Sequence, residues 1–174
     1  MISQVYKKRK FKEIRMNKKL LIVAAFVAII FAGSLSANDK ILGKWATEGG
    51  KSHVELKKCG DAICGTIVWL KSPTYGANDD AVKDGKAAAG ATKVDTENPD
   101  ASKRTQPIVG LTFLKGFKYD AGDDEWTNGE IYDPESGKLY VGELKMNGDN
   151  SLKLNGHLKI SRFLGKKQTW TRVQ

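Results

Sequence analysis

The sequence predicts an all-β protein, an eight-stranded antiparallel up-and-down barrel that follows an N-terminal signal peptide. Eight short segments after residue 38 alternate apolar and polar side chains, and Gly-, Asn- and Asp-rich turns separate several of them. A basic, then apolar, then small-residue stretch precedes them all. The expected domains are residues 1–37, an N-terminal extension with the signal peptide, and residues 38–174, the barrel.

The N-terminal segment has the three parts of a secretory signal. Eight of the 29 basic residues lie before Asn38, thirteen uncharged residues run from Leu20 to Ala32, and small residues lead to an expected cleavage after Ser36 or Ala37. Because the apolar run is shorter than the ~20 residues that span a bilayer, we expect a cleaved signal and not an anchor. The mature protein is expected to be soluble and periplasmic or secreted, to meet the membrane only during export, and to form at most a weak homodimer.

The formal net charge of +9 is concentrated in this N-terminal segment. The rest of the chain carries 21 basic and 19 acidic residues, which are interspersed along it. So small an excess, without a basic stripe, is not the electrostatic footprint of a protein that binds a phosphate backbone. We therefore expect no nucleic-acid partner.

Eight antiparallel strands remove their exposed edges when they close into a barrel. The turns at residues 48–50, 133–137 and 147–150 supply residues that tolerate positive φ. A two-sheet sandwich is the alternative, because period-two alternation fits both architectures. The expected strands are residues 41–47, 52–58, 62–71, 110–119, 125–132, 138–146, 151–160 and 167–173.

A long polar loop at about residues 72–107 interrupts this succession of strands. Its residues 79–96 contain few aliphatic side chains larger than alanine, so we expect a disordered insert there. Residues 98–107 are more constrained in composition and are expected to cover one mouth of the barrel.

Cys59 and Cys64 flank a short expected hairpin turn. An exported protein retains disulfides, and facing positions of a hairpin can meet disulfide geometry, so we expect a structural disulfide between them. A redox-active pair is the alternative, but the spacing is not C-x-x-C and no helix start follows to lower a thiol pKa.

Signatures of catalysis are sparse. His53 and His157 lack metal-ligand spacing, and no serine lies in a G-x-S-x-G motif. Strand-borne acids usually face solvent, and we expect a non-catalytic protein without metal or cofactor. The carboxylates that could instead form an acid/base pair in a cavity are Glu55, Glu130, Asp133 and Glu143.

The two ends of the barrel domain carry a structural motif. Gly43 and Trp45 open the first expected strand, and Trp170 and Arg172 close the last. Because these strands are neighbours in a closed barrel, Arg172 can cover Trp45 with a cation–π contact and plug the barrel base. A G-x-W start with a late arginine resembles the lipocalin and fatty-acid-binding (calycin) barrels.

A longer series of motifs follows in order along the chain: Gly43-Lys44-Trp45, Val54-Glu55-Leu56, Cys59-Gly60-Asp61-Ala62-Ile63-Cys64-Gly65, Ile67-Val68-Trp69-Leu70, Asn98-Pro99-Asp100, Gly110-Leu111, Gly129-Glu130-Ile131-Tyr132-Asp133-Pro134, Gly137-Lys138-Leu139-Tyr140 and Gly165-Lys166-Lys167-Gln168-Thr169-Trp170-Thr171-Arg172. Together they resemble the bacterial exported family catalogued as domain of unknown function 2147. The resemblance implies a small envelope protein with a lipocalin-like barrel and carries over no established reaction.

We therefore expect a barrel that binds a small hydrophobic or amphipathic molecule without transforming it. The alternative is an envelope interaction or assembly protein whose filled barrel presents functional loops. Four glycines within strands or at their ends are expected to leave room for a ligand: Gly65, Gly110, Gly129 and Gly142. The candidate ligand-binding residues are Trp69, Arg104, Phe113, Tyr132 and Tyr140.

Overall fold

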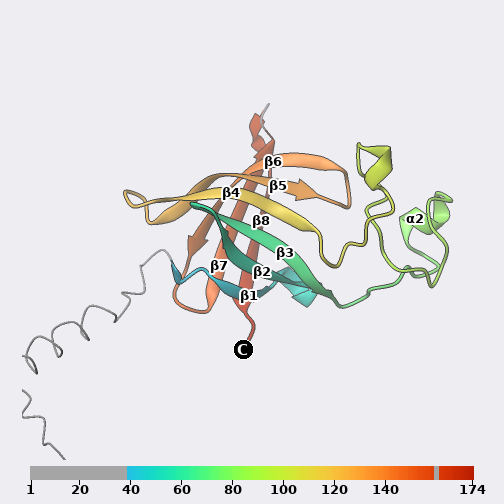
Figure 1. Ribbon diagram of the computed structural model, residues 1–174, viewed down its shortest axis with the longest axis horizontal. Helices are drawn as coiled ribbons and strands as arrows, with labels where there is room; N and C mark the ends of the chain where they lie inside the picture. The colour runs from blue at the N-terminus through green and yellow to red at the C-terminus, as the bar shows by residue number, and fades with distance from the viewer. Residues whose placement is uncertain (1–38, 159–160) are drawn as a thin grey trace, which may run out of the picture. The chain divides into compact units, whose positions relative to one another are not determined.

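The computed structural model describes residues 39–158 and 161–174, which form a closed barrel of eight strands (Figure 1). The predicted signal peptide lies outside the described residues. None of the helices within the described ranges is long and apolar enough to cross a membrane. The strands are β1 (Gly43–Ala46), β2 (Ser52–Cys59), β3 (Ala62–Leu70), β4 (Thr112–Asp120), β5 (Glu125–Asp133), β6 (Lys138–Met146), β7 (Ser151–Leu158) and β8 (Ser161–Arg172).

Each strand pairs antiparallel with its sequence neighbour, which confirms the predicted up-and-down barrel. Closure comes from β1 and β8, where Trp45 lies opposite Arg172 and Ala46 opposite Thr171. The strand bounds agree with the predicted ones to within two residues except at the start of β8, which begins six residues earlier, at Ser161. Pairing with β7 extends β8 there, across a register shift between His157 and Leu158 that the alternation of β8 alone does not reveal.

The inside of the barrel is packed at one end. This closed end holds the turns that join β2 to β3, β4 to β5 and β6 to β7. Its buried apolar side chains alternate with solvent-facing ones along each strand, as the pleat requires. They include Ile41, Trp45, Leu56, Phe117, Trp126, Leu144 and Leu152.

The opposite end carries the irregular segments. These are the 3-10 helix η2 (Glu48–Gly50), the turn between β5 and β6, and residues 71–111, which we call the long loop. The long loop contains the four-residue helix α2 (Asp80–Lys83) and the 3-10 helix η3 (Ala101–Lys103). In Figure 1 it extends beyond the strands on the side away from the β4–β5 hairpin.

The expectation that residues 79–96 are a disordered insert is wrong. Besides α2, isolated bridges pair Thr74 with Thr92 and Val94 with Pro107. Tyr75 is buried among them, and its hydroxyl donates to the carbonyl oxygen of Val94 at 2.8 Å and accepts from the Val94 N–H at 3.1 Å. One aromatic ring and these backbone bonds organise the segment, which a count of aliphatic residues does not register.

Candidate functional site

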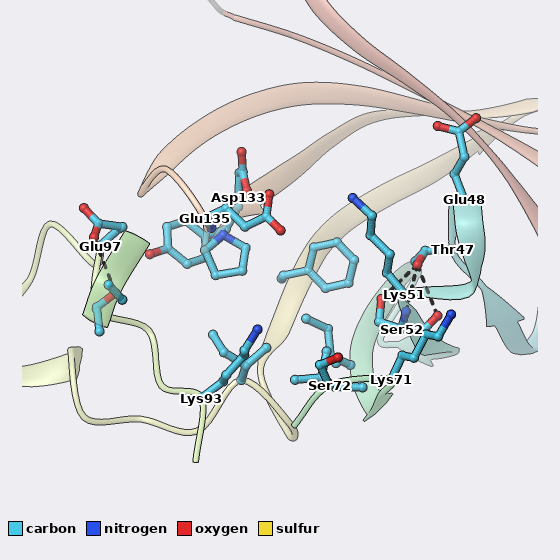
Figure 2. Close-up of a pocket in the computed structure, with 18 of the residues that line it drawn as sticks. Thr47, Glu48, Lys51, Ser52, Lys71, Ser72, Lys93, Glu97, Asp133 and Glu135 are labelled. Atoms are coloured by element: carbon cyan, nitrogen blue, oxygen red, sulfur yellow. Dashed lines mark hydrogen bonds between the residues drawn. The ribbon is translucent and has the colours of Figure 1, made fainter. Parts of the chain in front are cut away.

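A cavity of about 1120 Å³ occupies the open half of the barrel and the space between its rim and the long loop (Figure 2). Because successive side chains of a strand point to opposite faces of the sheet, every second residue of a strand faces the inside of the barrel. The inner wall includes Ile67, Leu70, Phe113, Ile131, Tyr140, Leu154 and Trp170, and Ile108 of the long loop joins them. The barrel is thus packed at one end and hollow at the other, and it is not filled throughout.

Tyr140 contributes a polar group to this apolar wall. It pairs with Ile131 in the β5–β6 register, so both side chains face inward, and only 8% of Tyr140 is exposed. The hydroxyls of Tyr75, Tyr119 and Tyr132 each donate a hydrogen bond to the protein, whereas no described residue bonds the Tyr140 hydroxyl. Tyr140 lines the cavity, so its hydroxyl can bond water or another molecule there.

An ion pair lies at the rim beside this tyrosine. The Nζ of Lys166 on β8 donates to Asp133 at the end of β5 at 2.6 Å and lies 5.8 Å from the centre of the Tyr140 ring. Burial alone would raise the pKa of Asp133, but hydrogen bonds from Lys166 and Ser136 outweigh it and hold that pKa below its usual value. The pKa of Lys166 is raised mainly by its hydrogen bond to Asp133.

The long loop is anchored to the barrel by a buried carboxylate. Asp95 has no exposed surface, and it accepts hydrogen bonds from the Tyr132 hydroxyl at 2.7 Å and from the Asn98 amide at 2.7 Å. Burial and the bond to Asp95 raise the pKa of Tyr132. Tyr132 pairs with Leu139 on the strand face opposite to Ile131, so it lines the outer part of the cavity, where the loop meets the barrel.

Trp69 lies outside the cavity, contrary to the expectation. Val54 pairs with Ile67, but the next pair is His53 with Trp69, so Val68 is an extra residue in β3. Such a β-bulge reverses the alternation beyond it. Trp69 is therefore 43% exposed and stacks on His53 with ring centres 4.4 Å apart, whereas Leu70 faces the cavity.

Arg104 also lies outside the cavity. Its side chain is exposed on the long loop, where Nε donates to the carbonyl oxygen of Asn98 at 2.8 Å. The expectation that residues 98–107 cover the mouth is wrong, because the loop residues on the cavity wall come from residues 71–97 and Ile108. The bridge of Val94 to Pro107 closes the intervening segment on itself, and of that segment only Thr96 and Glu97 line the cavity.

The strand glycines do not leave room for a ligand. At Gly65, Gly129 and Gly142 a Cβ atom would lie within 3.0 Å of the Leu114, Phe117 and Ile131 side chains, which already occupy that space. Gly110 has φ +97° in the turn before β4. Gly65, Gly129 and Gly142 make room for large neighbouring side chains and Gly110 allows a turn, so these glycines do not account for the cavity.

The closed end contains the terminal motif. Arg172 lies over the Trp45 ring at 4.2 Å, and a Cβ at Gly43 would lie 3.3 Å from its Nη1, so the glycine gives the guanidinium space. The Trp45 Nε1 donates to the carbonyl oxygen of Ile41 at 2.8 Å. Trp170 is also buried and forms the boundary between the packed end and the cavity.

The disulfide between Cys59 and Cys64 is confirmed. The two residues are not directly opposite, because Cys59 pairs with Ala62 and Cys64 with Lys57. The bridge runs diagonally across the β2–β3 hairpin, with Cα atoms 5.9 Å apart.

Of the four carboxylates considered for acid/base chemistry, only Asp133 lies on the cavity wall. Within the described residues, no group of three or more His, Cys, Asp or Glu is arranged to hold a metal ion. Sequence reasoning overlooked Asp95 and the rim lysines. Nothing in their local sequence distinguishes them from solvated residues, since their positions depend on contacts with distant strands.

The comparisons with known proteins agree with this architecture. A family model described as "Uncharacterized protein conserved in bacteria (DUF2147)" matches residues 43–172. Among solved structures, the chain is similar to protein HP1028 from the human pathogen Helicobacter pylori, which is described as belonging to the lipocalin family. The identity is 21%, the TM-score is 0.58, and the match covers 77% of this chain and 83% of that one. No curated protein matches the sequence. The likeness in structure shows the fold, a lipocalin-like barrel.

Proposed function

The chain belongs to the DUF2147 family of bacterial proteins, and we propose that it is an exported, non-catalytic carrier of a small apolar or amphipathic molecule. The cavity carries this proposal. The part of its wall inside the barrel is mainly apolar and its rim is charged, it opens at one end of the barrel, and its volume of about 1120 Å³ is ample for one small ligand. Eight-stranded barrels of the lipocalin type can hold one small ligand inside.

Phe113 and Tyr140 are the proposed contacts among the residues singled out from sequence. Phe113 lies against Trp170, with ring centres 6.3 Å apart, and supplies aromatic surface to the wall. The Tyr140 hydroxyl offers a hydrogen bond to a polar group of the ligand. Tyr132 is proposed to act indirectly, by holding the long loop through Asp95.

The binding experiment has two parts. Protein purified gently from its native envelope should release an apolar molecule on denaturation, detected by mass spectrometry. Protein stripped of that molecule should bind the neutral probe N-phenyl-1-naphthylamine saturably and one to one. Leu154→Trp, which fills the cavity from its wall, should weaken probe binding while the circular dichroism spectrum stays that of a barrel.

Tyr119→Phe is the matched control for Tyr140→Phe, because Tyr119 lies near the closed end and bonds Asp124. Tyr140→Phe should weaken binding of ligands with a hydrogen-bonding group, and Tyr119→Phe should not. If the folded protein carries nothing and binds no apolar compound across a broad panel, the carrier proposal fails in favour of an envelope interaction protein.

Export is proposed from residues 1–37 and is supported by the disulfide, since disulfides persist in oxidising compartments. Cell fractionation should recover a shortened, soluble form from the periplasm or medium. Recovery of the uncut chain from the cytosol would contradict export. Size-exclusion chromatography should show a monomer or a weak dimer.

A further inference from the structure

We infer that the mouth of the cavity selects an amphiphile with an anionic head, which Lys51 and Lys71 bind at the rim. This inference rests on the proposed carrier function and adds the chemical class of the ligand. Its evidence is the distribution of charge around the mouth.

Four lysines line the cavity, and two of them are neutralised by neighbouring carboxylates. Lys93 forms an ion pair with Asp79 at 2.9 Å, and Lys166 forms one with Asp133 at 2.6 Å. No described residue forms an ion pair with Lys51 or Lys71. These two lysines are the cavity cations available to a ligand within the part of the chain that the structure describes.

The backbone holds the two lysines together. The N–H of Lys71 donates to the carbonyl oxygen of Lys51 at 2.9 Å, just beyond the last β2–β3 pair, Ser52 with Leu70. Two lysines whose backbones are neighbours place two positive charges on one short stretch of rim, and both would attract an anion bound there. Leu70, which precedes Lys71 in the chain, also lines the cavity, so a head bound at the lysines leaves an apolar tail in the hollow of the barrel.

Acidic residues occupy other parts of the rim. In Figure 2, Lys51, Ser52 and Lys71 lie on one side of the cavity, and Glu97, Asp133 and Glu135 on the other. Glu48 is on the lysine side, but its carboxylate points away from Lys71. The acids of the long loop are largely paired with loop lysines, as in Asp80 with Lys83 and Glu97 with Lys86. This polarity favours a negative head on the lysine side and disfavours it on the other.

The test compares four ligands with one dodecyl tail, measured by displacement of N-phenyl-1-naphthylamine at near-neutral pH and low salt. They are dodecanoate, dodecyl phosphate, dodecanol and dodecylammonium. Since each exposed ion pair contributes little, we expect the anions to bind about tenfold more tightly than dodecanol, and dodecylammonium to bind most weakly. The preference should decrease in ~0.5 M salt, where exposed charges are screened. The ratio of the two anions separates a carboxylate ligand from a phosphate ligand.

The decisive variant is Lys51→Gln with Lys71→Gln, which should bring dodecanoate affinity to that of dodecanol. Lys115→Gln with Lys153→Gln is the matched control, because it removes the same charge from two exposed strand lysines outside the cavity. An unchanged preference in the Lys51/Lys71 variant would overturn the inference. Equal binding of dodecanol and dodecanoate to the native protein would also overturn it while leaving the carrier function standing. Binding of none of the four ligands, or of the probe, would overturn both.

Discussion

Arg172 ties the first and last strands together with both the face of its guanidinium and its N–H groups. The face covers the Trp45 ring, while the N–H groups donate to the carbonyl oxygens of Lys40, Leu42 and Asp149. A single side chain thus joins the segment before β1 to the β6–β7 turn. Because β1 and β8 share only two paired positions, the contacts of Arg172 add to the few that close the barrel between these strands.

A double-mutant cycle measures the coupling energy between Trp45 and Arg172. Trp45→Ala should cost roughly 3–5 kcal/mol of unfolding free energy, because it empties a fully buried ring site. Arg172→Ala should cost less, and the two losses should be smaller in combination than their sum, since the residues share a contact. Urea unfolding of the two single variants and the double variant provides the measurement. Strict additivity would show that the cation–π contact contributes nothing to closure.

Tyr132→Phe removes one of the two side-chain donors to the buried Asp95. A buried carboxylate that loses a donor is costly, so we expect a loss of about 1–3 kcal/mol. The long loop should also become more susceptible to limited proteolysis. Tyr119→Phe, which removes an exposed bond to Asp124, should have a much smaller effect on both measurements. Equal effects of the two variants would mean that Asp95 does not anchor the loop.

Asp133 predicts an acid-dependent stability. Its pKa in the folded state lies below the value of about 3.9 expected in the unfolded chain. Its contribution is therefore complete above that unfolded value and is lost as the pH falls through the lower folded pKa. In urea unfolding between neutral pH and pH ~2, Asp133→Asn should flatten the decline in stability. Asp123→Asn, in the exposed β4–β5 turn, should leave that decline intact.

At the scale of elements, alternation and turn chemistry predict the strands well, because each strand has one face in the barrel and one in solvent. The error at Trp69 shows the limit of this reasoning. Local alternation runs through Ile67 to Trp69 without interruption, yet the extra residue Val68 reverses it. A bulge is determined by pairing with the neighbouring strand, so it leaves no mark in the sequence of its own strand.

Gly129 illustrates a constraint within one pair of strands. A Cβ there would lie 2.2 Å from the Phe117 ring, which cannot yield as a flexible chain end can. Gly129→Ala should therefore destabilise the barrel by about 1–3 kcal/mol. The same substitution in a Phe117→Leu background should cost clearly less. Thermal unfolding followed by circular dichroism tests this, and an equal cost in both backgrounds would refute the steric explanation.

The disulfide constrains only the β2–β3 hairpin. Because the loop it closes is short, Cys59→Ser with Cys64→Ser should cost on the order of 1–3 kcal/mol and leave the barrel folded. Denaturant unfolding of the double variant measures the loss, and thiol titration of the native protein tests the bridge itself. Reactive thiols in protein from the envelope would show that the bridge does not form there.

At the scale of the whole molecule, the barrel was predictable from the sequence, but most of the cavity wall was not. Phe113 and Tyr140 lie on the cavity wall, in agreement with the prediction from the sequence. Arg104 does not, because the fold of the long loop directs it outward. The backbones of Lys51 and Lys71 are neighbours because β2 and β3 pair as far as Ser52 and Leu70, beyond the bulge at Val68, and Asp95 accepts a hydrogen bond from Tyr132, which is 37 positions away in the sequence.

The packed end of the barrel determines how a ligand would enter and leave the cavity. Trp45, Trp126 and Phe117 are fully or almost fully buried there and do not line the cavity, so within the described residues the cavity opens at the other end. In a carrier with one opening, the ligand leaves the cavity through the same opening by which it entered. A protein that supplies the ligand and a protein that receives it would then have to bind the same end of the barrel. They would bind there one after the other and not at the same time.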